Sequence, residues 1–253
     1  MLLNSDSITL EYKMVPGEVL KYKTIITTKQ NTVTDDGPQD TESYVEMLMD
    51  QRATNVKDEQ MDIEMYFSSG FVARDGQHQE LPVIGQTITM TMNRDGNILH
   101  TSLPSDTKQP TFPHRRLKIG DSWQEKNAID IPIGDNQTKQ LVLDYTYTLT
   151  RLAYEQGCNV AVIEVTAPET KTLLLEEQGQ KIFQTLTASG TTVFAYEAGR
   201  MVSSRVNTKT VISVEDEVVS TVEVLNKVEL QEVVPSKTED TQTFSNENFI
   251  IGM

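Results

Sequence analysis

The stretch Leu141-Val142-Leu143-Asp144-Tyr145-Thr146-Tyr147-Thr148-Leu149 places an apolar or aromatic side chain at every second position. Successive side chains of a β-strand point to opposite faces of a sheet, so this alternation predicts a strand with one buried and one solvated face. The same period of two recurs in the sets Ile8/Leu10/Tyr12/Met14, Val45/Met47/Met49, Met61/Ile63/Met65 and Ile88/Met90/Met92. We therefore expect an all-β protein made of antiparallel strands.

Turn-forming residues stand where this alternation stops. Asp95-Gly96 and Ala198-Gly199 each separate two apolar runs and predict hairpins. A further hairpin is expected around Glu215-Asp216-Glu217, between two long valine-rich runs. Because sheet twist accumulates along strands of this length, we expect curved sheets that form a barrel or half-barrel.

One segment leaves two interpretations open. Residues 168–179 could form a helix capped by Thr166, with Leu173, Leu174 and Leu175 inside and Gly179 at its end. The β-branched residues on both sides favour a strand to a similar degree. The protein is therefore expected to contain at most one short helix.

The chain contains two similar units. The first opens Val15-Pro16-Gly17-Glu18 and the second Lys118-Ile119-Gly120-Asp121, and Gly96 and Gly199 follow at the same spacing near the end of each unit. Such a duplication predicts two β repeats, residues 1–101 and 118–234, in which residues 15–101 and 118–214 have the same strand order. A proline-rich connector, residues 102–117, joins them.

A polar C-terminal tail, residues 235–253, follows the second repeat and ends Phe249-Ile250-Ile251-Gly252-Met253. We expect these last apolar residues to dock as a short strand, on this chain or on a neighbouring molecule.

The chain has one tryptophan and one cysteine. Trp123 follows the Gly120-Asp121 turn, where it is expected to be buried with its indole N–H bonded to a backbone carbonyl or to water. Cys158 cannot form an intrachain disulfide, and no neighbouring cation is present to activate its thiol.

Composition excludes several functions. The 253 residues carry a formal net charge of −15, which argues against binding to nucleic acid or to an anionic membrane surface by charge. Only 37 % of the residues are hydrophobic, and no apolar run reaches transmembrane length. No phosphate-binding, dinucleotide-binding or zinc-binding motif occurs, so no cofactor is expected and the protein is interpreted as a non-enzyme.

Two polar features have a functional and a structural interpretation. Glu64 and Glu164 occupy matching repeat positions and form the one carboxylate pair to consider for glycosidase-type hydrolysis. Each follows an apolar isoleucine in an alternating strand, which predicts a solvated face instead. The basic cluster His114-Arg115-Arg116 is expected to be part of a solvated linker rather than a binding site.

Methionines gather at apolar positions on three strands of the first repeat. Such soft, unbranched side chains fill irregular cores, and they also suit a surface that adapts to varied apolar ligands. The second interpretation predicts an apolar cavity inside the first repeat. Its candidate ligand-binding residues are Met47, Met49, Met61, Met65, Met90 and Met92.

A family resemblance rests on four segments that span most of the chain, from about Pro16 to Val233. These are Pro16-Gly17-Glu18 with Tyr22, Met92-Asn93-Arg94-Asp95-Gly96, Ile119-Gly120-Asp121-Ser122-Trp123, and the run from Tyr196 to Ser204. They are similar to segments of an uncharacterised bacterial family of exported, often lipid-anchored all-β proteins of unknown function.

The resemblance implies an extracytoplasmic location, in the periplasm or at the cell surface. Because the family has no assigned activity, it implies no functional residue. This chain departs from the family in having neither a leader nor a lipid-attachment cysteine near its start.

The expected function is therefore a non-catalytic binding or interaction module of the cell envelope. Its curved sheets would hold an apolar small molecule or present a surface to another envelope protein. The alternatives are a structural subunit that assembles through its terminal segments and, more remotely, a carboxylate-based hydrolase.

Overall fold

The computed structural model describes residues 7–102, 110–134, 137–177 and 179–236, with the backbone alone for 129–134, 137 and 177. These residues form twelve strands and no helix, which confirms the expected all-β class. The strands are β1 (Val19–Thr34), β2 (Gly37–Lys57), β3 (Gln60–Arg74), β4 (Gln77–Glu80), β5 (Thr87–Asn93), β6 (Ile98–Thr101), β7 (Ser122–Gly134), β8 (Gln137–Glu155), β9 (Cys158–Glu177), β10 (Gln180–Ala195), β11 (Arg200–Val214) and β12 (Glu217–Val234).

All twelve strands belong to one antiparallel sheet. Its order is β6-β5-β3-β2-β1-β12-β11-β10-β9-β8-β7, with β4 paired to β3 alone. The strands of the first repeat run β1-β2-β3-β5-β6, and those of the second run β7-β8-β9-β10-β11 in the same sense. β12 lies between the two runs and pairs with β1 on one side and β11 on the other. Apart from β4 and β12, the strands of residues 15–101 and 118–214 thus share an order, and they join in a single sheet.

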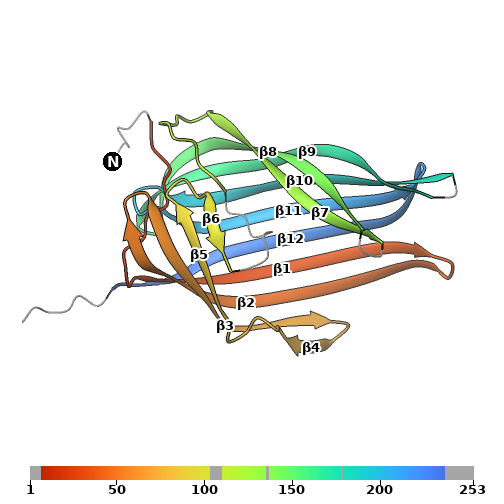
Figure 1. Cartoon of the computed structure of the whole chain (residues 1–253), viewed down its shortest axis with the longest axis horizontal. Helices are drawn as coiled ribbons and strands as arrows, with labels where there is room; N and C mark the ends of the chain where they lie inside the picture. Colours follow the sequence, from red (N-terminus) through yellow and green to blue (C-terminus); the bar gives the residue numbers. More distant parts are fainter. Residues whose placement is uncertain (1–6, 103–109, 135–136, 178, 237–253) are drawn as a thin grey trace, which may run out of the picture.

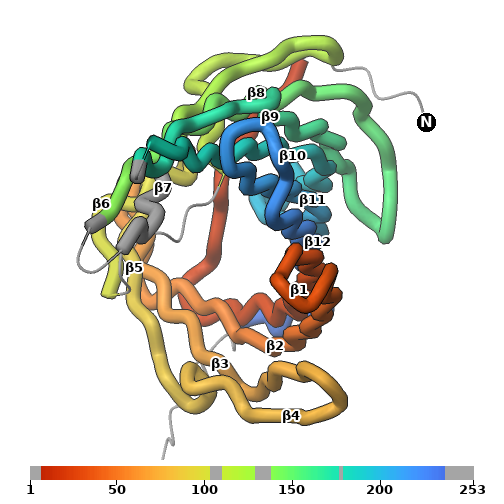
Figure 2. The backbone as a smooth tube through the Cα atoms, turned by 90° about the vertical axis from the view of Figure 1, so that its right-hand side faces the viewer, coloured from red at the N-terminus to blue at the C-terminus, as the bar shows by residue number. Residues whose placement is uncertain are grey.

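The sheet is strongly curved but not closed. Its long strands run along the long axis of the molecule (Figure 1), and the view along that axis shows them rolled around an interior space (Figure 2). β6 and β7 form the two edges. Irregularities in register occur in several pairs, as between Leu48 and Met49 where β2 meets β3. Such bulges bend a strand, which accounts for part of the curvature.

The expected hairpins occur where turn residues interrupt the alternation. β5 and β6 flank Asp95-Gly96, β10 and β11 flank Ala198-Gly199, and β11 and β12 meet at Glu215-Asp216. The segment with two interpretations is a strand, because residues 168–177 continue β9 without interruption. Its backbone groups pair with β10, as Leu175 does with Ile182.

The N-terminal segment, residues 7–14, differs from its prediction. Every second side chain is buried as predicted, namely Ile8, Leu10, Tyr12 and Met14. The segment nevertheless does not join the sheet as a strand. It crosses the space inside the rolled sheet (red in Figure 2). A strand-like pattern thus marks an extended segment whose alternate side chains fill the end of the roll.

The backbone of this segment bonds to both repeats. The Tyr12 N–H donates to the carbonyl of Arg94 (2.7 Å) in the β5–β6 turn, and the Lys13 N–H donates to the carbonyl of Gly199 (2.8 Å) in the β10–β11 turn. Ile8 exchanges two backbone hydrogen bonds with Leu117. The N-terminal segment therefore bridges the equivalent hairpin turns of the two repeats.

The described part of the connector, residues 110–117, also packs against the roll. Phe112 and Leu117 are buried, and the Phe112 N–H donates to the carbonyl of Asp95 (2.7 Å). Trp123 is half-buried rather than largely buried, but its indole N–H donates to the Thr111 carbonyl (2.9 Å), as expected. Its ring stacks on Tyr147, with centroids 5.5 Å apart.

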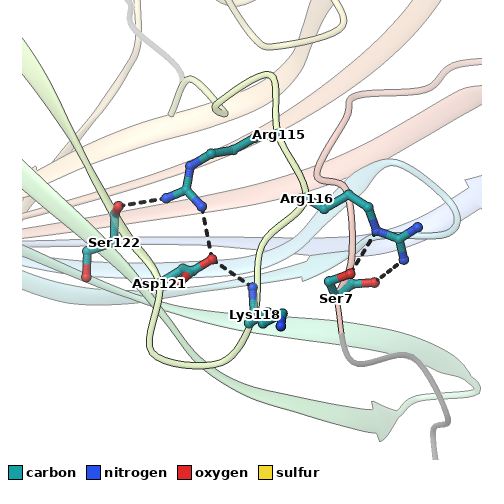
Figure 3. Close-up of polar contacts among 6 residues, drawn as sticks. All are labelled: Ser7, Arg115, Arg116, Lys118, Asp121 and Ser122. Atoms are coloured by element: carbon teal, nitrogen blue, oxygen red, sulfur yellow. Dashed lines mark hydrogen bonds and ion pairs between the residues drawn. The ribbon is translucent and has the colours of Figure 1, made fainter.

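The basic cluster is engaged within the chain (Figure 3). Arg115 binds the Asp121 carboxylate (2.9 Å) and the Ser122 carbonyl, and Arg116 binds the hydroxyl and carbonyl of Ser7. The Lys118 backbone N–H, followed by the Arg115 guanidinium, lowers the pKa of Asp121. His114 lies 3.0 Å from the Asp95 carboxylate. The cluster ties the connector to the N-terminal segment and to the start of β7.

The two equivalent turn glycines have little room for a side chain. Gly199 has a φ of +68°, and a Cβ there would lie 2.5 Å from the backbone nitrogen of Lys13. Gly96 has a φ of +94°, and its Cβ would lie 2.6 Å from the Pro110 carbonyl oxygen. Positive φ and close backbone approach both require glycine here.

A Gly199→Ala variant tests the contact between this turn and the N-terminal segment. Backbone strain costs about 1–2 kcal/mol, and the clash with Lys13 adds roughly 1–3 kcal/mol. The control is Gly157→Ala, because Gly157 has a φ of +80° but no atom near its missing Cβ, so that only the strain applies. Urea denaturation measures the loss of stability in each of the two variants. Equal losses of stability would show that the segment does not hold the turn.

Candidate ligand-binding cavity

The rolled sheet surrounds a partly open cavity of about 740 Å³. Both repeats line it: β1, β2, β3 and β5 on one side, and β7, β8, β9, β10, β11 and β12 on the other. Tyr12 and Met14 of the N-terminal segment also line it. Cavities of 300–1,000 Å³ with mostly apolar walls are typical small-molecule sites.

The six predicted methionines divide into two groups. Met47, Met49, Met65 and Met92 line the cavity. Met61 and Met90 do not, and they pack in the hydrophobic core with exposed fractions of 1 % and 2 %. For those two residues, core filling is the role that their surroundings support.

The cavity extends beyond the first repeat, where it was predicted. From the second repeat it receives Tyr145, Tyr147, Val165 and Met201. The first two belong to the alternating stretch that identified β8, so their inward direction was predictable. Their position opposite the methionines depends on how far the sheet rolls, which no local pattern encodes.

Tyrosines form the polar part of the aromatic wall. The Tyr12 hydroxyl donates to the Pro110 carbonyl (3.2 Å), and the Tyr22 hydroxyl donates to the Met201 carbonyl (3.1 Å). Burial raises the pKa values of Tyr12, Tyr22 and Tyr147 well above that of a free phenol. These hydroxyls therefore stay protonated and uncharged at any physiological pH.

One charged side chain occurs among the described residues that line the cavity, and it is neutralised by a partner. The Arg200 Nη1 donates to Glu18 Oε1 at 3.0 Å, with side-chain exposures of 17 % and 10 %. Arg200 Nε and Glu18 Oε2 are buried without a hydrogen-bond partner among the described residues. The pair joins the start of β11 to the residue before β1.

Gln51 is a residue that the sequence interpretation missed. It lies on β2 in the same inward register as Met47 and Met49, is 8 % exposed, and lines the cavity. The only signal in the sequence is a glutamine in the alternating run Met47, Met49, Gln51, Ala53, where an apolar residue would be expected.

The carboxylates considered for hydrolysis lie outside the cavity. Glu64 binds Arg52 at 2.6 Å, and Glu164 is exposed. Both alternate with buried neighbours, such as Ile63 and Ile163, and so face solvent. Within the described part of the chain, no three His, Cys, Asp or Glu side chains are grouped as a metal ion would require. No helix long and apolar enough to cross a membrane occurs in the same residues.

Comparisons with known proteins give little similarity in sequence. No protein-family model matches the chain, and no curated protein matches it. Among solved structures, the chain is similar to one that describes lipid-protein interactions in lipovitellin, with a TM-score of 0.49 and 11 % identity. That alignment covers 91 % of this chain and 26 % of the lipovitellin chain, so this protein spans about a quarter of its length.

Two further structures are more distant. DynF, from the dynemicin biosynthesis pathway of Micromonospora chersina, has a TM-score of 0.24 and 8 % identity over 90 % of this chain and 87 % of its own. An outer membrane lipoprotein-sorting protein domain from Vibrio parahaemolyticus has a TM-score of 0.14 and 9 % identity over 86 % and 87 %. Similarity at this level says nothing about ligand or partner.

The Glu18–Arg200 pair predicts unequal effects of single and double substitution. Glu18→Gln leaves the buried guanidinium without a counterion and is expected to cost about 3 kcal/mol. Replacing both residues, as in E18L/R200M, removes the charges together and is expected to recover most of that loss. Urea denaturation of the three proteins measures the coupling.

The control is the exposed pair Lys21–Glu232, whose atoms are 2.7 Å apart. Lys21→Met should leave the denaturation midpoint nearly unchanged, because water screens exposed pairs. If Glu18→Gln is as mild as Lys21→Met, the buried pair does not stabilise the fold.

Proposed function

We propose that this protein is non-catalytic and binds an apolar, lipid-like small molecule inside its rolled sheet. The observation that carries the proposal is the cavity of about 740 Å³, whose walls come from both repeats and are mostly apolar. A volume of this size greatly exceeds the voids of a packed interior, which rarely hold more than a water molecule.

The methionines in the wall support this function. Met47, Met49, Met65 and Met92 present unbranched, polarisable side chains to the cavity. Such side chains change rotamer at small cost and can fit hydrocarbon chains of different lengths. The second repeat supplies stiffer aromatic surfaces, Tyr145 and Tyr147, on the other side.

The proposed setting is outside the cytoplasm, in the periplasm or at the cell surface. It is supported by the resemblance of the glycine turns and flanking strands to those of exported bacterial proteins. The binding role is favoured over assembly through the N-terminal segment, since Tyr12 and Lys13 bond to turns of their own chain. The C-terminal tail lies outside the described residues, apart from Pro235 and Ser236.

Binding can be measured with N-phenyl-1-naphthylamine, an uncharged dye whose fluorescence rises in apolar surroundings. The wild-type protein is expected to bind it, and native mass spectrometry of freshly purified protein is expected to detect a copurified small molecule. Met47→Gln and Met49→Gln keep the side-chain length but place an amide in the wall. Each should weaken dye binding roughly tenfold, because an amide is costly to bury against an apolar ligand.

Leu48→Gln is the matched control. Leu48 lies between the two methionines on β2 but is 38 % exposed and points to the other face. Its substitution should leave dye binding unchanged. Absence of dye binding by the wild type, or equal effects of the three substitutions, would contradict the proposal.

A further inference from the structure

Gln51 has an unusual position for a polar side chain. Its neighbours across the sheet are Leu20 on β1 and Met65 on β3, and both line the cavity with it. Its inward neighbours along β2 are Met49 and Ala53. Within the sheet, Gln51 is therefore flanked on four sides by apolar residues.

Among the described residues no hydrogen bond to the Gln51 amide occurs, and its atoms are not among the fully buried ones that lack a partner, so they can be reached from the cavity. A primary amide offers two N–H donors and one carbonyl acceptor, and burying it without partners is unfavourable. Because Gln51 lines the cavity and is only 8 % exposed, a partner for its amide would approach from inside the cavity. For packing alone, leucine or methionine would be the better residue at this position, as at Met47 and Met49.

The charges around the cavity restrict what this partner can be. Arg200 is the one charged side chain among the described lining residues, and Glu18 already neutralises it. The tyrosine hydroxyls stay protonated because burial raises their pKa values. A ligand carboxylate inside the cavity would thus find no unpaired cation among the described lining residues, which is unfavourable.

We propose that the ligand is amphipathic and carries an uncharged hydrogen-bonding group, such as a hydroxyl, ester or amide, which binds the Gln51 side chain. Its hydrocarbon part contacts the methionine wall. This inference rests on the proposed function and specifies the chemical class of its ligand.

Competition against N-phenyl-1-naphthylamine at pH 8 tests the proposal with three probes of equal chain length. Oleyl alcohol has an uncharged hydroxyl, oleate has a carboxylate, and octadecene has no polar group. Oleyl alcohol is expected to displace the dye at concentrations several-fold lower than either of the others. If oleate displaces the dye at the lowest concentration of the three probes, the proposal is overturned.

The Gln51→Leu variant tests whether the Gln51 side chain causes the preference for oleyl alcohol. It should lower the affinity for oleyl alcohol about two- to tenfold, the value of one hydrogen bond, while octadecene and the dye bind as before. Gln79→Leu, at an exposed position of β4 away from the cavity, is the control and should change nothing. If Gln51→Leu does not fold, Gln51→Met makes the same comparison.

The outcomes separate this inference from the proposed function. Dye binding without a preference for the alcohol, or a preference that survives Gln51→Leu, means that water alone satisfies Gln51 and overturns the inference. The proposed function stands in that case. Failure of the wild type to bind the dye overturns both.

Discussion

The fold depends on covering the apolar inner face at one end of an open, rolled sheet. The N-terminal segment does this with alternate buried side chains, and an aromatic cluster forms where it meets distant parts of the chain. The Tyr12 ring lies 5.0 Å from Phe112 of the connector and 5.3 Å from Phe194 of β10. Phe112 and Phe194 are themselves 4.7 Å apart. Edge-to-face and offset contacts of this kind add to the burial of the rings. Without the segment, the rings of Phe112 and Phe194 and the interior behind them would face water.

The sequence allowed the strands, hairpins and curvature to be predicted, because each follows from local backbone geometry. A period of two identifies the inward residues of β8, from Leu141 to Leu149, and glycine marks turns such as the one at Gly199. Local backbone geometry does not predict where an extended segment packs. Residues 7–14 alternate like a strand, yet their hydrogen bonds go to turns far along the chain, and nothing in their own pattern selects those partners.

The candidate site was predictable in part for the same reason. Methionines on the inward face could be identified, and four of the six line the cavity. Which of them do so depends on the packing of other elements, since Met92 lines the cavity while Met90, two residues earlier on the same strand, does not. Gln51 was overlooked because hydropathy patterns emphasise apolar residues. Its significance comes from the neighbours that the strand register places around it.

The pairing of β1 with β12 has a consequence for biosynthesis. These strands lie near opposite ends of the chain, and they join the two repeats in the middle of the sheet. During translation, β1 leaves the ribosome long before its second partner exists, and its open side is exposed for that time. Pairings between such distant segments form slowly, and exposed strand edges promote association with other chains. A chaperone would therefore be most useful while the first repeat has been synthesised and the open edge of β1 has no partner.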